Sequence, residues 1–149
     1  MDSSKQISSG AFDEMCVNYE LHICGDLKPP PYQEPNIQDI ISYAEGLFTD
    51  NYIYQKDSET ESYDYMSDSP MRGDCDDLVI TLLEDLISIG YVDNGQAKWV
   101  FGVINGERHA WLLITKEEET YIFDTYNPFG NKYTNVSNNY KEEFLVYRY

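Results

Sequence analysis

Positive charge is scarce in this chain. Of its 149 residues only 10 are Lys or Arg, against 27 Asp or Glu, and the formal net charge is −17 at pH 7. Proteins that bind nucleic acids or anionic membranes need clustered basic residues to meet the phosphates. The composition therefore argues against nucleic-acid and membrane binding. It suits a basic partner or a bound cation, or it simply keeps the protein in solution.

Long apolar segments and an export signal are also missing. No run reaches the roughly 18 apolar residues that a membrane helix requires, and residues 1–6 lack the charge and the apolar core of a signal peptide. We therefore expect a cytoplasmic protein. Residues 1–10 are polar and rich in serine, which favours a flexible terminus.

Cysteine and histidine are few. Three cysteines, an odd number in a chain without an export signal, predict free thiols and no disulfide framework. Cys16, His22 and Cys24 lie close together, but no second ligand pair with the spacing of a zinc site follows them. We interpret both cysteines as small buried hydrophobic residues and His22 as an ordinary histidine.

The chain does have enough apolar and aromatic residues to form a core, at 42% and 15% of its composition. Its length predicts one domain over residues 1–149. Asn36 is a good N-cap, and the apolar residues after it have helical spacing, which predicts a helix over about 37–48. A brief extended piece at 51–56 precedes an acidic loop at 57–72. Such a loop often forms a lid or a binding element, and partial disorder is the alternative.

The second half of the chain predicts one helix and several strands. The helix is predicted from an apolar stripe that runs from Leu78 to Ile87, with Asp74 as a cap and Gly90 at its end. Strands are expected at 98–104, 107–115, 120–124 and 143–149, with a polar connection over 134–140. The first two strands flank Asn105-Gly106, the preferred two-residue hairpin turn.

The hairpins bring an imidazole and a carboxylate together. The Asn105-Gly106 turn sets Gly102 opposite His109, where a glycine leaves room for a ring or a substrate. If the next hairpin turns between residues 116 and 117, His109 falls directly opposite Asp124. Their side chains then share a face within hydrogen-bonding reach.

Cys75 lies in the first turn of the second predicted helix. A thiol at a helix start, followed by an imidazole and a carboxylate on adjacent strands, is the layout of a cysteine nucleophile with its base and orienter. The helix N-terminus favours the thiolate, but Asp74, Asp76 and Asp77 oppose it by like-charge repulsion. A calcium ion held by Asp74 and Asp76 would relieve this conflict. In the plainer alternative, the carboxylates cap the helix and favour its dipole.

At these residues the chain resembles the transglutaminase-like superfamily of the papain-like fold. The resemblance rests on Gly73-Asp74-Cys75 at a helix start, His109-Ala110-Trp111 on a strand and Asp124 at the end of the next strand. The Asp-Cys-Asp-Asp run is similar to the Asp-Cys-Glu-Asp of bacterial transglutaminase-like cysteine proteinases, some of which bind calcium beside the nucleophile. The resemblance implies an α+β fold, with N-terminal helices packed on a small antiparallel sheet and the nucleophile at the start of the central helix.

The same resemblance implies cysteine-dependent acyl transfer. Cys75 would be the nucleophile, His109 the general base and then acid, and Asp124 the group that holds the imidazole's tautomer. Water as the acceptor makes a peptidase or amidase acting on a protein or peptide, whereas an amine makes a transglutaminase. No cofactor is required, although Ca²⁺ at Asp74 and Asp76 is compatible with this reading.

The segment after Asp124 differs from the family pattern, and the sequence leaves the oxyanion donor open. The family aspartate is often followed by Pro and Thr, but here residues 125–128 are Thr-Tyr-Asn-Pro, so this strand end is expected to have a different shape. An oxyanion donor beyond the backbone N–H of the nucleophile is not identified, and Tyr52, Gln55 and Trp99 are the candidates. Trp111 is interpreted as a core residue.

Two other functions are alternatives. A noncatalytic interaction protein would keep the fold and use the 57–72 loop to bind a basic partner, although such a role needs no intact triad. A metal hydrolase would use Asp74, Asp76, His109 and Asp124. Hydrolases of that kind seldom need the cysteine, and side chains near one helix start point in different directions.

Overall fold

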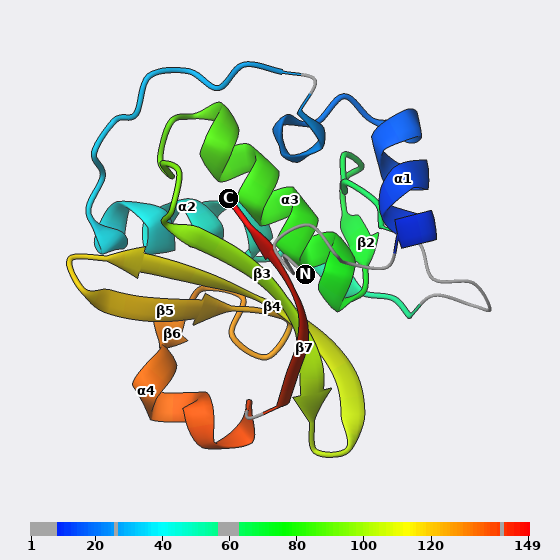
Figure 1. Ribbon diagram of the computed structural model, residues 1–149, viewed down its shortest axis with the longest axis vertical. Coiled ribbons are helices and arrows are strands. Elements are labelled where there is room, and N and C mark those ends of the chain that lie inside the picture. Colours follow the sequence, from blue (N-terminus) through cyan, green and yellow to red (C-terminus); the bar gives the residue numbers. More distant parts are fainter. Residues whose placement is uncertain (1–8, 26, 57–62, 141) are drawn as a thin grey trace.

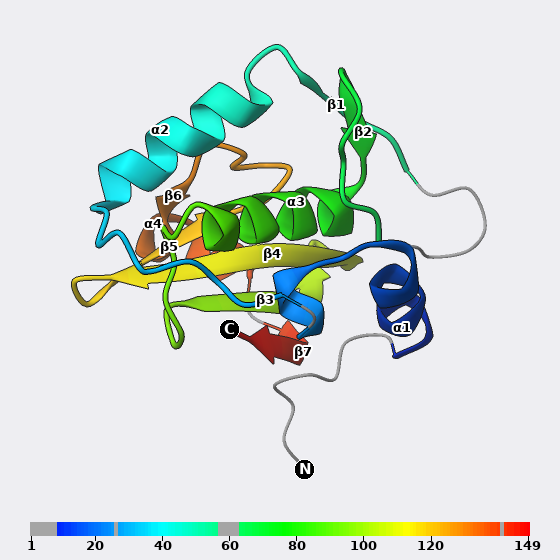
Figure 2. The same ribbon diagram turned by 90° about the horizontal axis from the view of Figure 1, so that it is seen from above.

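The computed structural model describes residues 9–25, 27–56, 63–140 and 142–149, which form a layer of helices over an antiparallel sheet. Helix α3 (Cys75–Ser88) lies along one face of the sheet, and α2 (Ile37–Phe48) lies on the same side (Figures 1 and 2). The strand order is β6-β5-β4-β3-β7. The strands are β3 (Ala97–Ile104), β4 (Glu107–Lys116), β5 (Glu119–Phe123), β6 (Asn131–Lys132) and β7 (Glu142–Arg148).

Both predicted helices form, and each begins with a capping box. In α2 the Asn36 side chain accepts from the Asp39 N–H at 2.9 Å, and the Asp39 carboxylate accepts from the Asn36 N–H at 3.0 Å. In α3 the apolar stripe is fully buried against the sheet and includes Leu78, Leu82 and Leu86. Burial of this stripe places the first turn of α3 next to β4.

The first hairpin has the predicted register, but the second does not. Gly102 pairs with His109, and the turn residues Asn105 and Gly106 have φ values of 51° and 77°. In the second hairpin Glu117 and Glu118, not residues 116 and 117, adopt positive φ, so the pairing is displaced by two residues from the prediction. Because side chains alternate with a period of two, this displacement leaves every side chain on its expected face.

Apolar side chains cover both faces of the sheet. The face under α3 includes Trp99, Leu112 and Phe123. The opposite face carries a second cluster that includes Trp111 and Tyr140. The segment of α4 (Tyr133–Val136) and η2 (Ser137–Asn139) packs against this second cluster. Residues 134–140, predicted as a polar connection, therefore contain short helical turns and deliver a buried tyrosine to the sheet.

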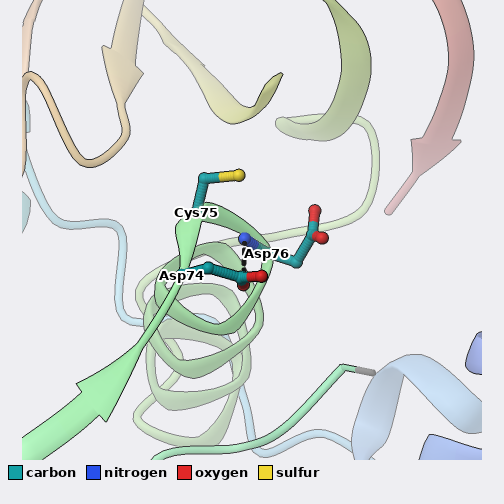
Figure 3. A group of neighbouring side chains, drawn as sticks. All are labelled: Asp74, Cys75 and Asp76. Atoms are coloured by element: carbon teal, nitrogen blue, oxygen red, sulfur yellow. Dashed lines mark hydrogen bonds between the residues drawn. The ribbon is translucent and has the colours of Figure 1, made fainter. Parts of the chain in front are cut away.

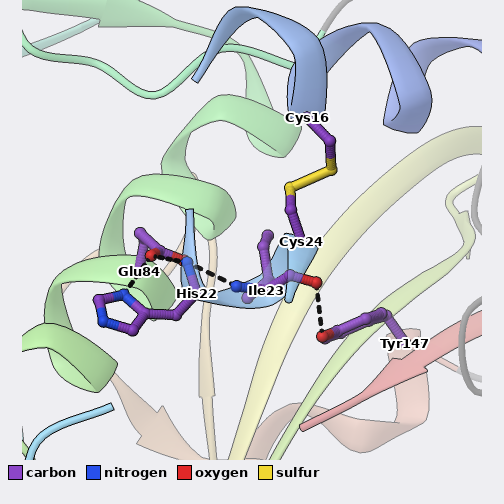
Figure 4. Close-up of a disulfide and its surroundings, with 6 residues drawn as sticks. All are labelled: Cys16, His22, Ile23, Cys24, Glu84 and Tyr147. Carbon is purple, nitrogen blue, oxygen red and sulfur yellow. Dashed lines mark hydrogen bonds and ion pairs between the residues drawn. A yellow bond between two sulfur atoms is a disulfide. The ribbon is translucent and has the colours of Figure 1, made fainter. Parts of the chain in front are cut away.

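The prediction of free thiols at Cys16 and Cys24 is wrong, because these residues form a disulfide with a Cα–Cα distance of 5.6 Å (Figure 4). Helix α1 (Ser9–Asn18) was not predicted, and its end folds back onto η1 (His22–Cys24) and brings the two cysteines together. All three cysteines lie in the described residues, and Cys75 is the one with a free thiol. Disulfides are rare in the reducing cytoplasm, so this pairing does not support the expected cytoplasmic location.

A buried carboxylate on α3 holds the disulfide-linked segment in place (Figure 4). Glu84 contacts His22 Nδ1 at 2.6 Å, and it accepts from the backbone N–H groups of His22 and Ile23. The Tyr147 hydroxyl on β7 donates to the Ile23 carbonyl at 2.9 Å. His22 is therefore part of a structural network that joins the N-terminal segment to α3.

The described part of the acidic 57–72 loop is attached to α3. Tyr63 is buried and packs edge-on against Trp99 at 5.2 Å between ring centroids. The Met66 N–H donates to Thr81 Oγ1 at 2.8 Å. The loop ends in β2 (Met71–Gly73), which pairs in parallel with β1 (Tyr52–Tyr54). Residues 57–62 of the expected lid or binding element lie outside the described residues.

Two further expectations concern the chain's start and its relation to membranes. Residues 1–8 of the expected flexible terminus lie outside the described residues, whereas residues 9 and 10 begin α1. In the described part of the chain, no helix combines the length and apolar character that crossing a bilayer requires.

Candidate active site

Cys75 is the first residue of α3, and the chain enters this helix through a tight contact. A Cβ added to Gly73 would lie 2.6 Å from Asp77 Cβ and 2.8 Å from Met66 Sδ, so only glycine fits. Asp74 is the N-cap, and its carboxylate accepts from the N–H groups of Asp76 and Asp77 at 3.1 and 3.3 Å. The glycine and the cap together fix the position of the thiol.

The three aspartates around Cys75 have different surroundings. Asp77 completes the capping box by accepting from the Asp74 N–H at 3.1 Å, and its other oxygen accepts from the Asp64 N–H at 2.8 Å. Asp74 and Asp76 are both buried. Figure 3 shows the Asp74 carboxylate folded back toward the Asp76 N–H, with the Cys75 sulfur pointing away from it. Two of the three carboxylates thus cap the helix, as the plainer sequence interpretation predicted.

The environment of the Cys75 thiol opposes its ionisation. Burial raises the pKa of Cys75, and the nearby Asp76 carboxylate raises it further; the Asp74 carboxylate acts in the same direction. Hydrogen bonds from the backbone of Ala110 and Asp76 lower the pKa but do not offset these effects. The contact with Ala110 places the sulfur beside the residue that follows His109.

His109 and Asp124 form a buried pair. His109 Nε2 lies 2.9 Å from Asp124 Oδ2, and the Asp124 side chain is completely inaccessible to solvent. Strand β4 pairs with β5 only from Leu112 onward, so the part of β4 that carries His109 lies beyond the end of β5. Asp124 follows the last residue of β5, and there it reaches back to the imidazole. The predicted pair is present although the predicted register is not.

Asp124 accepts five hydrogen bonds. Oδ2 receives the Tyr140 hydroxyl at 2.5 Å as well as His109, and Oδ1 receives the Tyr126 N–H together with the backbone and side-chain N–H groups of Asn127. Burial alone raises the pKa of Asp124, but the bonds from His109 and Tyr140 outweigh it and lower the pKa below its ordinary value of 3.8.

The hydrogen bonds that Asp124 accepts determine the tautomer of His109. An ionised carboxylate can only accept hydrogen bonds, so Nε2 of His109 carries a proton and donates it to Asp124. In the neutral imidazole Nδ1 is then the unprotonated nitrogen, which can act as a base.

A cleft of about 330 Å³ joins the thiol and the imidazole. Cys75 and His109 both line it, and Asp124 lies behind the imidazole. Tyr54 and Tyr126 also line the cleft, and both rings are largely exposed. Tyr126 stacks on His109, with ring centroids 4.9 Å apart. The structure therefore brings the three sequence-predicted residues to one place, with an exposed tyrosine over the imidazole.

Sequence reasoning missed Tyr126, Asn127 and Tyr140. Tyr126 and Asn127 belong to the Thr-Tyr-Asn-Pro segment that already differed from the family pattern, and an Asx-type turn built on Asp124 is the physical basis of that difference. Tyr140 comes from a segment with no readable pattern, and only the tertiary structure brings it to Asp124.

None of the three candidate oxyanion donors is among the residues that line the cleft. The Tyr52 hydroxyl donates to the Gly73 carbonyl at 2.8 Å, beside the start of α3. Trp99 is fully buried in the core, so it is excluded as a donor to a substrate. Gln55 is exposed, and its backbone N–H donates to Gly73. Trp111 is a core residue, as predicted, and contacts His109 and Tyr140.

The described residues contain one group that could hold a metal ion. It consists of Asp74, Cys75 and Asp76, whose candidate ligand atoms lie within 4.8 Å of one another. His109 and Asp124 are not part of it, and the Asp124 oxygens are already occupied by hydrogen-bond donors. The ligand set expected for a metal hydrolase therefore does not assemble among the described residues.

Comparison with known proteins gives a fold but not a family. No protein-family model and no curated protein matches the chain. Among solved structures, calcium-bound LapG of Legionella pneumophila matches with a TM-score of 0.55 at 18% identity, over 95% of this chain and 88% of that one. A second LapG structure and an EGTA-treated one give TM-scores of 0.52 and 0.51 at 19% identity, over 92% of this chain and 81% and 79% of theirs. At 18–19% identity, this likeness shows that the chain shares the fold of LapG.

Proposed function

We propose that this protein is a cysteine-dependent acyl-transfer enzyme, and specifically a peptidase or amidase that acts on a protein or peptide. The observation that carries the proposal is the cleft in which the Cys75 thiol and the His109 imidazole meet, with Asp124 buried behind the imidazole. A helix-start thiol, a base and an oriented carboxylate are the parts that covalent acyl transfer needs.

The reaction divides into two steps. In the first, Cys75 Sγ attacks the carbonyl carbon while its proton passes to His109 Nδ1. His109 returns that proton to the leaving amine as the C–N bond breaks, and a thioester remains on Cys75. In the second, water attacks the thioester, its proton passes to His109, and the carboxylic acid and the free thiol are released. An amine in place of water would give transglutaminase chemistry.

Asp124 serves both steps through the imidazole. Its hydrogen bond keeps the proton on Nε2, so that Nδ1 accepts the proton that the thiol loses. Because the pKa of Asp124 is lowered, the carboxylate stays ionised and stabilises the imidazolium that forms. The backbone N–H of Cys75, in the first turn of α3, is a candidate donor to the developing oxyanion.

Transfer of the thiol proton to His109 is the main route to an active nucleophile here, since burial and two carboxylates oppose a free thiolate. Asp74 and Asp76 are buried oxygen donors with candidate ligand atoms within 4.8 Å of each other, and they fit a hard cation such as Ca²⁺. A cation there would supply positive charge beside the thiol. Backbone carbonyls and water would complete its coordination.

The surface of the cleft suits a peptide. Tyr54 ends β1, Tyr126 follows β5, and both largely exposed side chains line the same cleft as Cys75. Aromatic rings provide rigid contact area at a low entropic cost. A peptide lying between the two rings would present its carbonyl groups to the thiol.

The proposal is tested with p-nitrophenyl acetate, a small activated ester. The parent protein is expected to release nitrophenolate in a burst equal to one per molecule, followed by slower turnover. Mass spectrometry should place the acetyl group on Cys75. Cys75→Ala should remove the burst, and His109→Ala should slow it strongly, because that variant lacks the base that takes the thiol proton. Absence of a burst in the folded parent protein would contradict the proposal. Acid quenching of the parent protein mixed with a peptide pool, followed by mass spectrometry of Cys75, then identifies the substrate.

A further inference from the structure

Tyr140 contacts the same carboxylate oxygen as the imidazole. Its hydroxyl donates to Asp124 Oδ2 at 2.5 Å, and His109 Nε2 lies 2.9 Å from that oxygen. Tyr140 is 3% exposed and follows η2, so it reaches Asp124 from a part of the chain distant from β4 and β5. Two donors thus share one oxygen of the orienting carboxylate.

Asn127 fixes the direction of the Tyr140 hydroxyl. The Asn127 side-chain N–H group donates to the Tyr140 oxygen at 3.3 Å and to Asp124 Oδ1 at 3.0 Å. Because the phenol oxygen accepts from Asn127, its own proton is directed to Asp124. Burial and the neighbouring Asp124 raise the pKa of Tyr140 well above its ordinary value, so the phenol keeps that proton. Asp124, Asn127 and Tyr140 form a closed ring of hydrogen bonds.

The packing of the Tyr140 ring makes its position rigid. The ring meets Trp111 edge-on at 5.0 Å between centroids, and its centroid lies 6.3 Å from that of His109. The Tyr133 hydroxyl donates to the Tyr140 carbonyl at 3.3 Å. One side chain therefore contacts the carboxylate through its hydroxyl and lies against the imidazole through its ring.

We propose that Tyr140 is a positioning residue for acyl transfer, which donates to the same Asp124 oxygen as His109 and thereby fixes the imidazole at the cleft. This inference rests on the proposed function. It assigns a role to the segment 133–140, which carries no group that lines the cleft with Cys75. Without the Tyr140 hydroxyl, Asp124 Oδ2 loses one of the two donors described here. His109 then takes a less defined position relative to the thioester, and a displacement of about 1 Å can lower a rate roughly a hundredfold.

The test compares Tyr140→Phe with Tyr147→Phe, a matched variant that removes a buried tyrosine hydroxyl which donates to the Ile23 carbonyl and does not contact Asp124. Steady-state turnover of p-nitrophenyl acetate is expected to fall roughly tenfold to a hundredfold in Tyr140→Phe, with KM unchanged. Turnover in Tyr147→Phe is expected to remain within about twofold of the parent. Equal turnover in Tyr140→Phe and the parent would overturn the inference.

A spectroscopic measurement separates positioning from a purely structural effect. In protein with ¹⁵N-labelled histidine, the Nε2 proton of His109 is expected to move downfield in Tyr140→Phe, because Asp124 Oδ2 then serves one donor instead of two. His22, which pairs with Glu84, is the internal reference. An unmoved His109 signal in a folded Tyr140→Phe protein would overturn the inference. If that variant does not fold, Asn127→Ala is expected to shift the same signal to a smaller degree, and no shift would overturn it.

Failure of the proposed function would look different. In that case the parent protein would give no burst with the ester, whatever residue stands at position 140. The His109 signal would still report whether the Tyr140 hydroxyl acts on the imidazole. A normal parent burst with an unchanged Tyr140→Phe protein would reject only the inference about Tyr140.

Discussion

At the scale of single residues, the candidate site depends on how completely Asp124 is satisfied. Its two oxygens accept five hydrogen bonds, and these bonds keep a fully buried carboxylate ionised. A buried charge without such partners would be strongly destabilising. The same contacts that stabilise the fold therefore also set the tautomer of His109.

The lowered pKa of Asp124 makes a prediction about pH. A depressed folded-state pKa contributes stability that is present above the unfolded value of 3.8 and is lost as pH falls through the folded value. Asp124→Asn should therefore lower the free energy of unfolding by about 2 kcal/mol near pH 6, because charged hydrogen bonds are lost. The gap between parent and variant should narrow near pH 3.

Urea denaturation at the two pH values measures the difference in the free energy of unfolding between the parent and Asp124→Asn. Glu119→Gln is the control, since Glu119 is half exposed and its 3.5 Å ion pair with Lys132 contributes little. A gap between the parent and Asp124→Asn that does not change with pH would show that the Asp124 charge is not what stabilises the fold.

At the scale of elements, the sequence predicted those features that depend on interactions between residues close together in the chain. The α2 boundaries, the α3 cap and the first hairpin register depend on side chains within a few residues, such as Asn36 and Asp39 or Asn105 and Gly106. The second turn was misplaced because Glu117 and Glu118 have no preference for positive φ, and tertiary pairing imposes it on them.

Other features depend on contacts that the sequence order does not reveal. The Cys16–Cys24 bond requires α1 to fold back onto η1, and the Tyr140–Asp124 bond requires the segment after β6 to cover the second sheet face. The proximity of His109 and Asp124 was predictable, because a period-two alternation tolerates a two-residue register error. The residues that support them were not, because they come from turns without a repeating pattern.

The close contact at Gly73, just before α3, gives a prediction at the scale of elements. Gly73→Ala should lower the free energy of unfolding by about 1–3 kcal/mol, because its Cβ would meet Asp77 and Met66 at distances below 3 Å. Gly46→Ala is the matched control, since no atom lies within 4 Å of its added Cβ and it lies inside α2. That change should stabilise the protein by roughly 0.5–1 kcal/mol, because alanine favours helix. Urea denaturation of both variants checks this, and a Gly73→Ala protein as stable as the parent would contradict it.

At the scale of the whole molecule, the dominant feature is a net charge of −17. Mutual repulsion among so many carboxylates destabilises the compact state, and salt screens it. Any added cation therefore stabilises this protein to some degree. A specific calcium site at Asp74 and Asp76 must be distinguished from this general effect, because both raise the melting temperature.

Constant ionic strength makes the distinction. Exchanging NaCl for CaCl₂ under that condition should raise the melting temperature of the parent, and Ca²⁺ at a hundredfold its Kd corresponds to about 2.7 kcal/mol. Asp76→Ala should lose this increment, because one of the two buried carboxylates is gone. It should keep the increase that NaCl alone produces, since its net charge changes by only one. The quantity compared is the rise in melting temperature that calcium produces in each protein. A lower melting temperature of Asp76→Ala without calcium therefore does not affect the comparison. An unchanged melting temperature in the parent would leave proton transfer to His109 as the only means of activating Cys75.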